Sequence, residues 1–172
     1  MRIHSIFASF VIALAGLMAL PAQAQRPQSL GAFTDWHAFR AVEGNGQLVC
    51  FMTSRPTNSV GAEGRLRGPV TLLVTHRPGV ETNVVSLEAG FPFDPELNPV
   101  ASIGNKRFAL FTQGETGWAY PDDDSKLIEQ MKAGLTLLLD SVSTRGTEIR
   151  DTFSLRGFTK AHNRISEACR IS

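Results

Sequence analysis

Turn-forming residues divide most of the chain into short apolar segments. Residues 33–39 alternate in polarity, and residues 70–75 form a run of β-branched and apolar side chains. Clusters of Gly, Pro and Asn interrupt the pattern at 43–46, 77–79 and 104–106. Short β-type segments separated by such turns are typical of sandwiches and barrels. The sequence therefore predicts a mainly β protein: a single sandwich or jelly-roll-like domain with one or two short helices.

The expected strands cover residues 33–39, 47–53, 70–75, 83–87, 99–103, 107–112, 118–120, 135–143 and 147–155. Two pairs are expected to form hairpins, across Gly104-Asn105-Lys106 and across Thr144-Arg145-Gly146. Residues 58–68, rich in glycine and charge, are expected to be a loop.

One helix is expected to open in the segment 121–125, where acidic side chains favour the positive end of the helix dipole. Leu127, Ile128 and Met131 would share its buried face, and Asp124 or Ser125 would cap it. A short last helix is expected after Thr159, which is the candidate capping residue.

The N-terminal segment has the organisation of a secretory signal peptide. Arg2 precedes the apolar run 6–20, and Pro21 and Ala22-Gln23-Ala24 follow it as a cleavage site. A transmembrane anchor is the alternative, but the run is shorter than the roughly 20 apolar residues that span a bilayer. We therefore expect residues 1–24 to be a signal peptide, 25–32 a flexible lead and 33–172 one β domain, exported to the periplasm or outer envelope.

Charge argues against a nucleic-acid partner, and hydropathy argues against a membrane span. Lys and Arg number 17 and Asp and Glu number 16. Removal of residues 1–24 takes away Arg2 and no acid, which leaves the two signs balanced. Neutral charge provides no steering toward nucleic acid, and no later segment is apolar and long enough to span a membrane.

Cys50 and Cys169 are the two cysteines of the chain. An exported protein meets an oxidising compartment, which favours one disulfide between them. Free redox thiols and intermolecular pairing are the alternatives, but no Cys-x-x-Cys motif is present.

An ordered set of motifs resembles the invasion-associated locus B family over nearly the whole mature chain. The motifs are Phe33-Thr34-Asp35-Trp36, Cys50-Phe51-Met52, His76-Arg77-Pro78, Gly90-Phe91-Pro92-Phe93, Phe111-Thr112-Gln113-Gly114, Trp118-Ala119, Met131-Lys132-Ala133-Gly134, Ser143-Thr144-Arg145-Gly146-Thr147, Asp151-Thr152-Phe153-Ser154-Leu155, Gly157-Phe158 and Ala168-Cys169. The resemblance implies a small periplasmic or outer-envelope protein of an alphaproteobacterium, in a family whose founding members are linked to host-cell invasion. It provides no catalytic residues to carry over. Family members often have additional cysteines, whereas this chain has two.

Residues that suggest catalysis or metal binding each have a structural alternative. His76, Asp151 and Ser154 are the residue types of a hydrolase triad, but the sequence lacks a Gly-x-Ser-x-Gly elbow. Asp122-Asp123-Asp124 lacks the spacing of a calcium loop, and helix capping explains it. His37, His76 and His162 show no paired metal spacing. We expect no enzyme, no metal site and no cofactor.

Binding to a partner is the function that the sequence favours. Phe91 and Phe93 flank a proline in a segment too proline-rich for a central strand, which predicts an exposed aromatic patch. Arg77 and Arg145 add planar donors suited to carboxylates or phosphates. The other prominent aromatic residues, Trp36, Phe111 and Trp118, are expected to pack in the core.

The leading hypothesis is a non-enzymatic interaction module that binds an unknown envelope or host-surface protein. The alternatives are an enzyme that acts on an envelope polymer or small molecule, and a chaperone-like stress factor.

Overall fold

The computed structural model describes residues 26–64 and 66–171, so the expected signal peptide lies outside the described residues. Its strands are β1 (Gln28–Phe33), β2 (Trp36–Val42), β3 (Leu48–Ser54), β4 (Asn58–Val60), β5 (Thr71–Arg77), β6 (Glu81–Glu88), β7 (Val100–Ile103), β8 (Lys106–Gln113), β9 (Thr116–Ala119), β10 (Thr136–Val142) and β11 (Glu148–Ser154). The helices are α1 (Pro121–Ala133) and α2 (Phe158–Cys169). The expected fold class, a mainly β, sandwich-like domain with one or two short helices, is confirmed.

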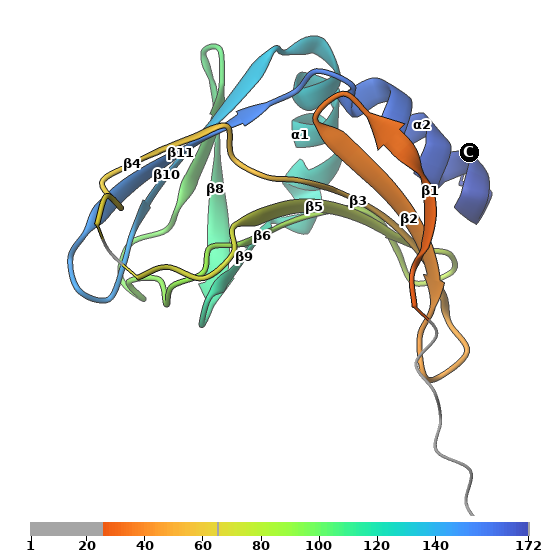
Figure 1. Cartoon of the computed structure of the whole chain (residues 1–172), viewed down its shortest axis with the longest axis horizontal. Coiled ribbons are helices and arrows are strands. Elements are labelled where there is room, and N and C mark those ends of the chain that lie inside the picture. Colours follow the sequence, from red (N-terminus) through yellow and green to blue (C-terminus); the bar gives the residue numbers. More distant parts are fainter. Residues whose placement is uncertain (1–25, 65, 172) are drawn as a thin grey trace, which may run out of the picture.

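All the strands join one antiparallel sheet in the order β1-β2-β3-β5-β6-β9-β8-β7-β10-β11-β4. The sheet changes direction at β8, which pairs with β9 on one side and with β7 on the other. The first half of the sheet runs from β1 to β9 in this order, and the second half runs from β7 to β4. Figure 1 shows the two halves, with α1 and α2 on the same side of the molecule. Both halves and both helices contribute to one apolar core, which gives the domain its sandwich-like character.

Hairpins expected from the sequence are present in both places. β7 pairs with β8 around Gly104-Asn105, and β10 pairs with β11 in unbroken register from Thr136–Ser154 to Val142–Glu148. In β10 the alternate residues Leu137 and Leu139 are buried, as a period of two requires.

The N-terminal expectations need correction. Residues 28–32, expected to be part of a flexible lead, form β1 with Phe33. Residues 33–39 are not one strand, because Thr34 has a left-handed φ of 56° and turns the chain between β1 and β2. The turn places Trp36 in the core, fully buried, where its indole Nε1 donates to the Ser154 carbonyl at 3.0 Å.

The segment 58–68 is also more ordered than a loop. Its first three residues form β4, which pairs with the edge of β11 from Asn58 to Val60. The pairing brings the following segment, including Arg67, against the second half of the sheet.

Neither helix is capped by the residue that the sequence suggested. The N-cap of α1 is Tyr120, without a side-chain hydrogen bond, and Asp124 lies in the first turn. The N-cap of α2 is Gly157, so Thr159 lies inside the helix. A Cβ at Gly157, whose φ is +90°, would lie 1.9 Å from the Phe33 carbonyl oxygen, and therefore only glycine allows β1 to pass here.

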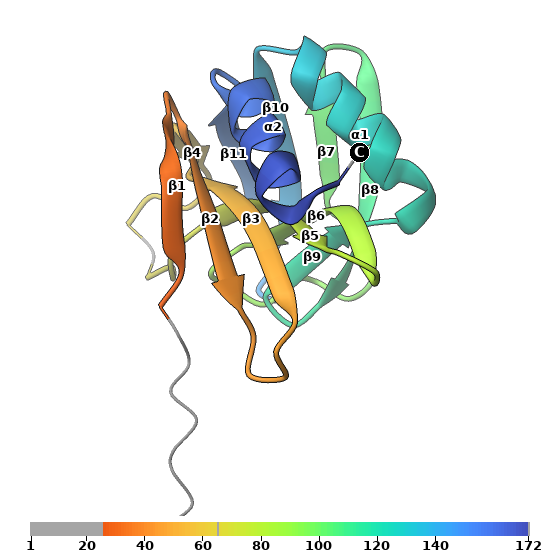
Figure 2. The same ribbon diagram turned by 90° about the vertical axis from the view of Figure 1, so that its right-hand side faces the viewer.

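The expected disulfide is present. Cys50 in β3 and Cys169 at the end of α2 have Cα atoms 5.9 Å apart and form one bridge across 119 residues. The bridge attaches α2 to the face of β2 and β3 that it covers (Figure 2).

Candidate functional site

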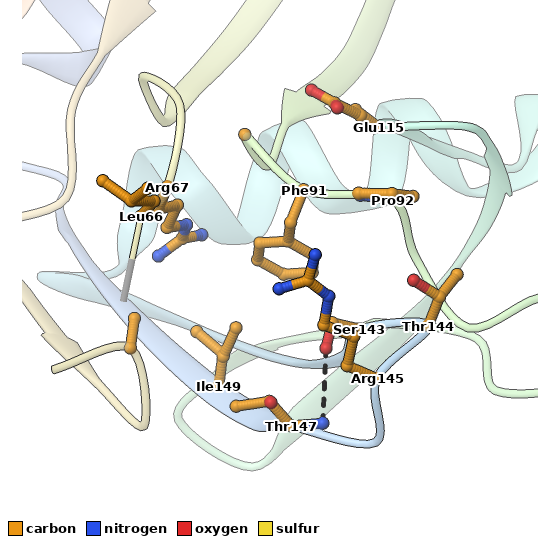
Figure 3. Close-up of a pocket in the computed structure, with 12 residues that line it drawn as sticks. Leu66, Arg67, Phe91, Pro92, Glu115, Ser143, Thr144, Arg145, Thr147 and Ile149 are labelled. Carbon is orange, nitrogen blue, oxygen red and sulfur yellow. Dashed lines mark hydrogen bonds between the residues drawn. The ribbon is translucent and has the colours of Figure 1, made fainter. Parts of the chain in front are cut away.

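A cleft of about 390 Å³ lies between the loop after β6, the turn of the β10–β11 hairpin and the segment after β4. We call it the Phe91 cleft; its lining includes Leu66, Arg67, Phe91, Pro92, Arg145 and Ile149 (Figure 3). Two of the four residues that the sequence suggested for partner binding, Phe91 and Arg145, therefore line one cavity.

Arg67 is the anchored basic group of this cleft. Its Nη1 and Nη2 donate to the two carboxylate oxygens of Asp151 at 2.8 and 2.6 Å, and its Nε donates to the Ala89 carbonyl at 2.7 Å. The Ser59 hydroxyl also donates to Asp151, at 2.5 Å. Asp151 is fully buried, so this two-pronged pairing compensates a charge that water does not reach.

The Phe91 ring lies against this anchored guanidinium. The Cζ atom of Arg67 is 4.8 Å from the ring centroid, within the range of a cation–π contact. The Phe93 ring meets Phe91 edge-on, with ring centroids 5.4 Å apart. Phe93 is only 4% exposed, so the expectation of an exposed pair is wrong for Phe93. The backbone N–H of Phe93 donates to the Gly114 carbonyl at 3.0 Å, and this hydrogen bond holds the segment with the Phe93 ring toward the core.

Two glycines allow the walls of the cleft to meet. Gly68 N–H donates to the Gly90 carbonyl at 2.9 Å, and Gly90 has a φ of +71°. A Cβ at Gly90 would lie 2.4 Å from the Gly68 carbonyl oxygen. Without a side chain at this position, the Arg67 segment and the Phe91 loop can lie in contact.

Arg145 lies in the turn of the β10–β11 hairpin. The turn is fixed because Thr144 N–H donates to the Pro92 carbonyl at 3.0 Å and Thr147 N–H donates to the Ser143 hydroxyl at 3.3 Å (Figure 3). Arg145 itself is exposed. Within residues 26–64 and 66–171, its guanidinium has no hydrogen bond or ion pair, so its donors are available to a ligand.

Arg77 does not join this cleft. It lies at the end of β5, where it pairs with Glu43 at 3.1 Å and with Glu81. Its guanidinium is therefore committed to two carboxylates on the first half of the sheet.

The family model described as "Invasion associated locus B (IalB) protein" matches residues 36–166. The chain belongs to the invasion associated locus B family. The match begins at the first residue of β2 and ends within α2, so it includes every residue discussed for the Phe91 cleft. It confirms the resemblance expected from the ordered motifs. No curated protein and no solved structure matches the chain.

The three residues considered for a hydrolase triad are not brought together in this IalB-family chain. Asp151 is held by Arg67 and Ser59. Ser154 accepts from the Arg156 N–H at 3.2 Å, and His76 contacts the Ser166 hydroxyl at 3.2 Å. Each side chain has a structural role in its own surroundings.

His76 and His162 form a buried pair between the sheet and α2. Their rings meet edge-on at 5.3 Å; His76 Nδ1 accepts from the Asn83 N–H, and His162 Nε2 lies 2.8 Å from Asn83 Oδ1. Burial, with the nearby Lys132 charge, lowers the pKa of each histidine to about 4. Both rings are therefore neutral at physiological pH, which favours a packing role.

The described part of the chain was expected to hold no metal site and no membrane span. It contains no group of three or more His, Cys, Asp or Glu side chains arranged to hold a metal ion. Of the acidic run, Asp123 pairs with Lys126 at 2.9 Å and Asp124 accepts from Val85. No helix in these residues has the length and apolar character to cross a membrane.

The sequence missed a second aromatic group. Phe111 and Tyr120 are 38% and 41% exposed, and Trp118 is half-buried, so the expected core position is wrong for Phe111 and Trp118. Strand parity carries the signal: Phe108 and Leu110 of β8 are buried, so Phe111 must point to the opposite face. The run of apolar residues in β8 conceals this alternation.

Proposed function

We propose that this IalB-family protein is an exported interaction module of the bacterial envelope, and that its Phe91 cleft binds an acidic segment of a partner protein. The observation that carries the proposal is that an available guanidinium, Arg145, and a flat aromatic ring, Phe91, line one cleft. Arginine and aromatic residues are enriched among the energetically important residues of protein interfaces.

The roles of the two arginines differ. Arg67 is already neutralised by Asp151 and serves as a fixed wall behind Phe91. Arg145 retains a full positive charge at the rim, where a planar guanidinium suits a carboxylate. Glu115 also lines the cleft, on the side away from Arg145 in Figure 3, so the positive charge is local to one rim.

Two observations support export. The family is the invasion associated locus B family, and the two cysteines form a disulfide, which persists in oxidising compartments. N-terminal sequencing of the protein recovered from the envelope should give Gln25 as the first residue. Recovery with Met1 retained would contradict export by a cleaved signal peptide.

Crosslinking in cells, followed by mass spectrometry of the captured proteins, tests the binding proposal. We expect one abundant envelope or host-surface protein, lost with Phe91→Ala and with Arg145→Ala. Arg107→Ala is the matched control, because Arg107 is an exposed arginine of β8 outside the cleft. Capture that is unchanged in both cleft variants would overturn the assignment of this site.

Two other results would replace the proposal. A broad mixture of captured proteins would indicate the chaperone-like function. Turnover of an envelope polymer, with a pH profile abolished by one carboxylate substitution, would indicate an enzyme.

A further inference from the structure

A second cleft, of about 600 Å³, lies on the outer face of the sheet, away from the core. We call it the Trp118 cleft; its lining includes Arg77, Glu81, Val84, Ser86, Phe111 and Trp118. The lining residues lie on strands β5, β6, β9 and β8, and Pro121 and Asp124 at the start of α1 complete the cleft (Figure 1). None of them belongs to the Phe91 cleft.

Flat aromatic surfaces are presented to water in this cleft. Phe111 and Trp118 are direct cross-strand partners whose rings stack nearly parallel, with centroids 5.6 Å apart and an interplanar angle of 20°. The exposed Tyr120 ring lies beside the cleft, 5.3 Å from Phe111, and is not part of its lining. The buried face of the same strands already provides the core, so these exposed rings are not required to close it.

Polar side chains line the same cleft as the rings. Thr75, Thr82, Ser86 and Gln113 contribute hydroxyl groups and an amide to the lining. Such groups form hydrogen bonds without demanding a charged ligand.

The charges in the cleft disfavour an anionic ligand. Arg77 is neutralised by its pairs with Glu43 and Glu81. The Asp124 carboxyl also lines the cleft, and no basic side chain other than Arg77 is among the described residues that do so. A phosphate, nucleic acid or acidic polymer would find no available cation here.

We propose that the Trp118 cleft binds a neutral oligosaccharide. A pyranose ring has an apolar face of C–H groups and a rim of hydroxyls. The C–H face would stack on Trp118 and Phe111, while the rim would bond to the hydroxyl and amide groups around them. The proposal is independent of the protein-binding role assigned to the Phe91 cleft.

A further aromatic pair indicates the direction in which a bound oligosaccharide would run. Phe39 and Phe51 stack at 5.2 Å, and Phe51 is in register with Thr75, which pairs with Val84 of β6. Phe51 therefore lies on the same outer face, roughly 15 Å from Trp118 by strand spacing. An oligosaccharide that crosses the strands would contact both pairs, so affinity should rise with the length of the saccharide.

The test uses the mature oxidised protein with two neutral series, oligomers of β-1,4-linked glucose and of N-acetylglucosamine, and with oligogalacturonate as the acidic comparison. Binding is followed by calorimetry and by tryptophan fluorescence, since Trp36 is fully buried and Trp118 is the accessible reporter. We expect saturable binding of a neutral series, with an affinity that rises with the length of the oligosaccharide. Binding should quench or shift the fluorescence of Trp118.

Trp118→Ala should weaken binding by about tenfold or more, while Trp118→Phe should retain most of it. Phe111→Ser provides an independent variant if Trp118→Ala does not fold. Leu135→Ala is the control, because Leu135 is an exposed apolar residue outside both clefts, and it should bind the saccharide as the unsubstituted protein does.

Three results would overturn the proposal. They are no saturable binding of either neutral series, binding of the acidic oligomer alone, and equal binding by the folded Trp118 and Phe111 variants. Self-association that is lost with Trp118→Ala, without saccharide binding, would assign this face to a second copy of the chain.

Discussion

The Asp124 carboxylate accepts a hydrogen bond from the backbone N–H of Val85 at 3.0 Å. β6 pairs with β9 only from Ser86 to Glu88, so Val85 lies just beyond the end of that ladder. A side chain from α1 therefore continues the hydrogen bonding of the sheet at the point where β9 stops. The acidic residue expected to cap α1 instead attaches the helix to β6.

Asp124 should make the stability of the fold depend on pH. Burial raises the pKa of Asp124 to about 6, the Val85 hydrogen bond opposes the shift, and the charges of Glu81 and Asp123 add to it. The folded state then binds more protons than the unfolded state between about pH 4 and 6, so the contribution of Asp124 to stability falls as the pH rises through that window. A shift of this size corresponds to at most about 3 kcal/mol.

Urea unfolding at pH 4.5 and 7.5 checks this dependence. Asp124→Asn keeps an acceptor for Val85 but removes the titration, so its stability relative to the unsubstituted protein should improve at the higher pH. Asp122→Asn is the control, because Asp122 is exposed in the same turn. Identical pH profiles for the unsubstituted protein and Asp124→Asn would contradict the prediction.

The buried histidine pair should act in the opposite direction. Burial, with the Lys132 charge, lowers the pKa of His76 and His162 from 6.5 to about 4. Their neutral forms contribute stability above pH 6.5 that is lost as the pH falls toward 4. Histidine titration by NMR should show both rings unprotonated at pH 5.5, and His162→Gln should reduce the loss of stability on acidification. Titration of both rings near 6.5 would show that burial does not control them.

Local patterns predicted the regular parts of this fold because the information lies within each segment. The β10–β11 hairpin has alternating side chains on both strands and a turn with Gly146 at a φ of +74°. Leu127, Ile128 and Met131 are three and four residues apart, and their burial in α1 follows directly.

Features that depend on distant contacts could not be predicted in this way. Gly157 replaces Thr159 at the start of α2 because β1 passes against it, which no local signal reveals. Phe91 and Arg145 line one cleft because the loop after β6 is hydrogen-bonded to the hairpin turn through Pro92 and Thr144. Phe93 is buried rather than exposed for the same reason, because its backbone pairs with Gly114 and tertiary pairing decides which face of a short apolar segment is covered.

The disulfide should contribute substantially to stability. It closes a loop that spans 119 residues and holds α2 on β3. Cys50→Ala with Cys169→Ala should lower the free energy of unfolding by about 2–5 kcal/mol. Unfolding in urea measures the loss, and thiol titration of the denatured, unreduced protein should find no free thiol. Two reactive thiols would show that the bridge does not form in the protein as isolated.

The two phenylalanines of the proline-rich loop should separate folding from binding. Phe93 is almost fully buried, so Phe93→Ala should cost about 3–5 kcal/mol of stability. Phe91 is half-buried at the cleft, and Phe91→Ala should cost clearly less while removing partner capture. Equal losses of melting temperature in the two variants would place both rings in the core.

Breaking the buried ion pair between Arg67 and Asp151 should destabilise the fold. Among the described residues, Arg67→Ala leaves Asp151 fully buried with the Ser59 hydroxyl as its one side-chain partner, which should cost about 3–5 kcal/mol. Arg67→Met combined with Asp151→Leu removes both charges and should recover most of this loss, because an apolar pair needs no compensation.

The matched control is Arg145→Ala, which removes a guanidinium from the same cleft without leaving a buried charge. Its free energy of unfolding should change by less than about 0.5 kcal/mol. If the double variant is as unstable as Arg67→Ala, the loss comes from packing against Phe91 rather than from the unpaired carboxylate. A stable double variant would show that the charge pair is not needed to hold the fold together.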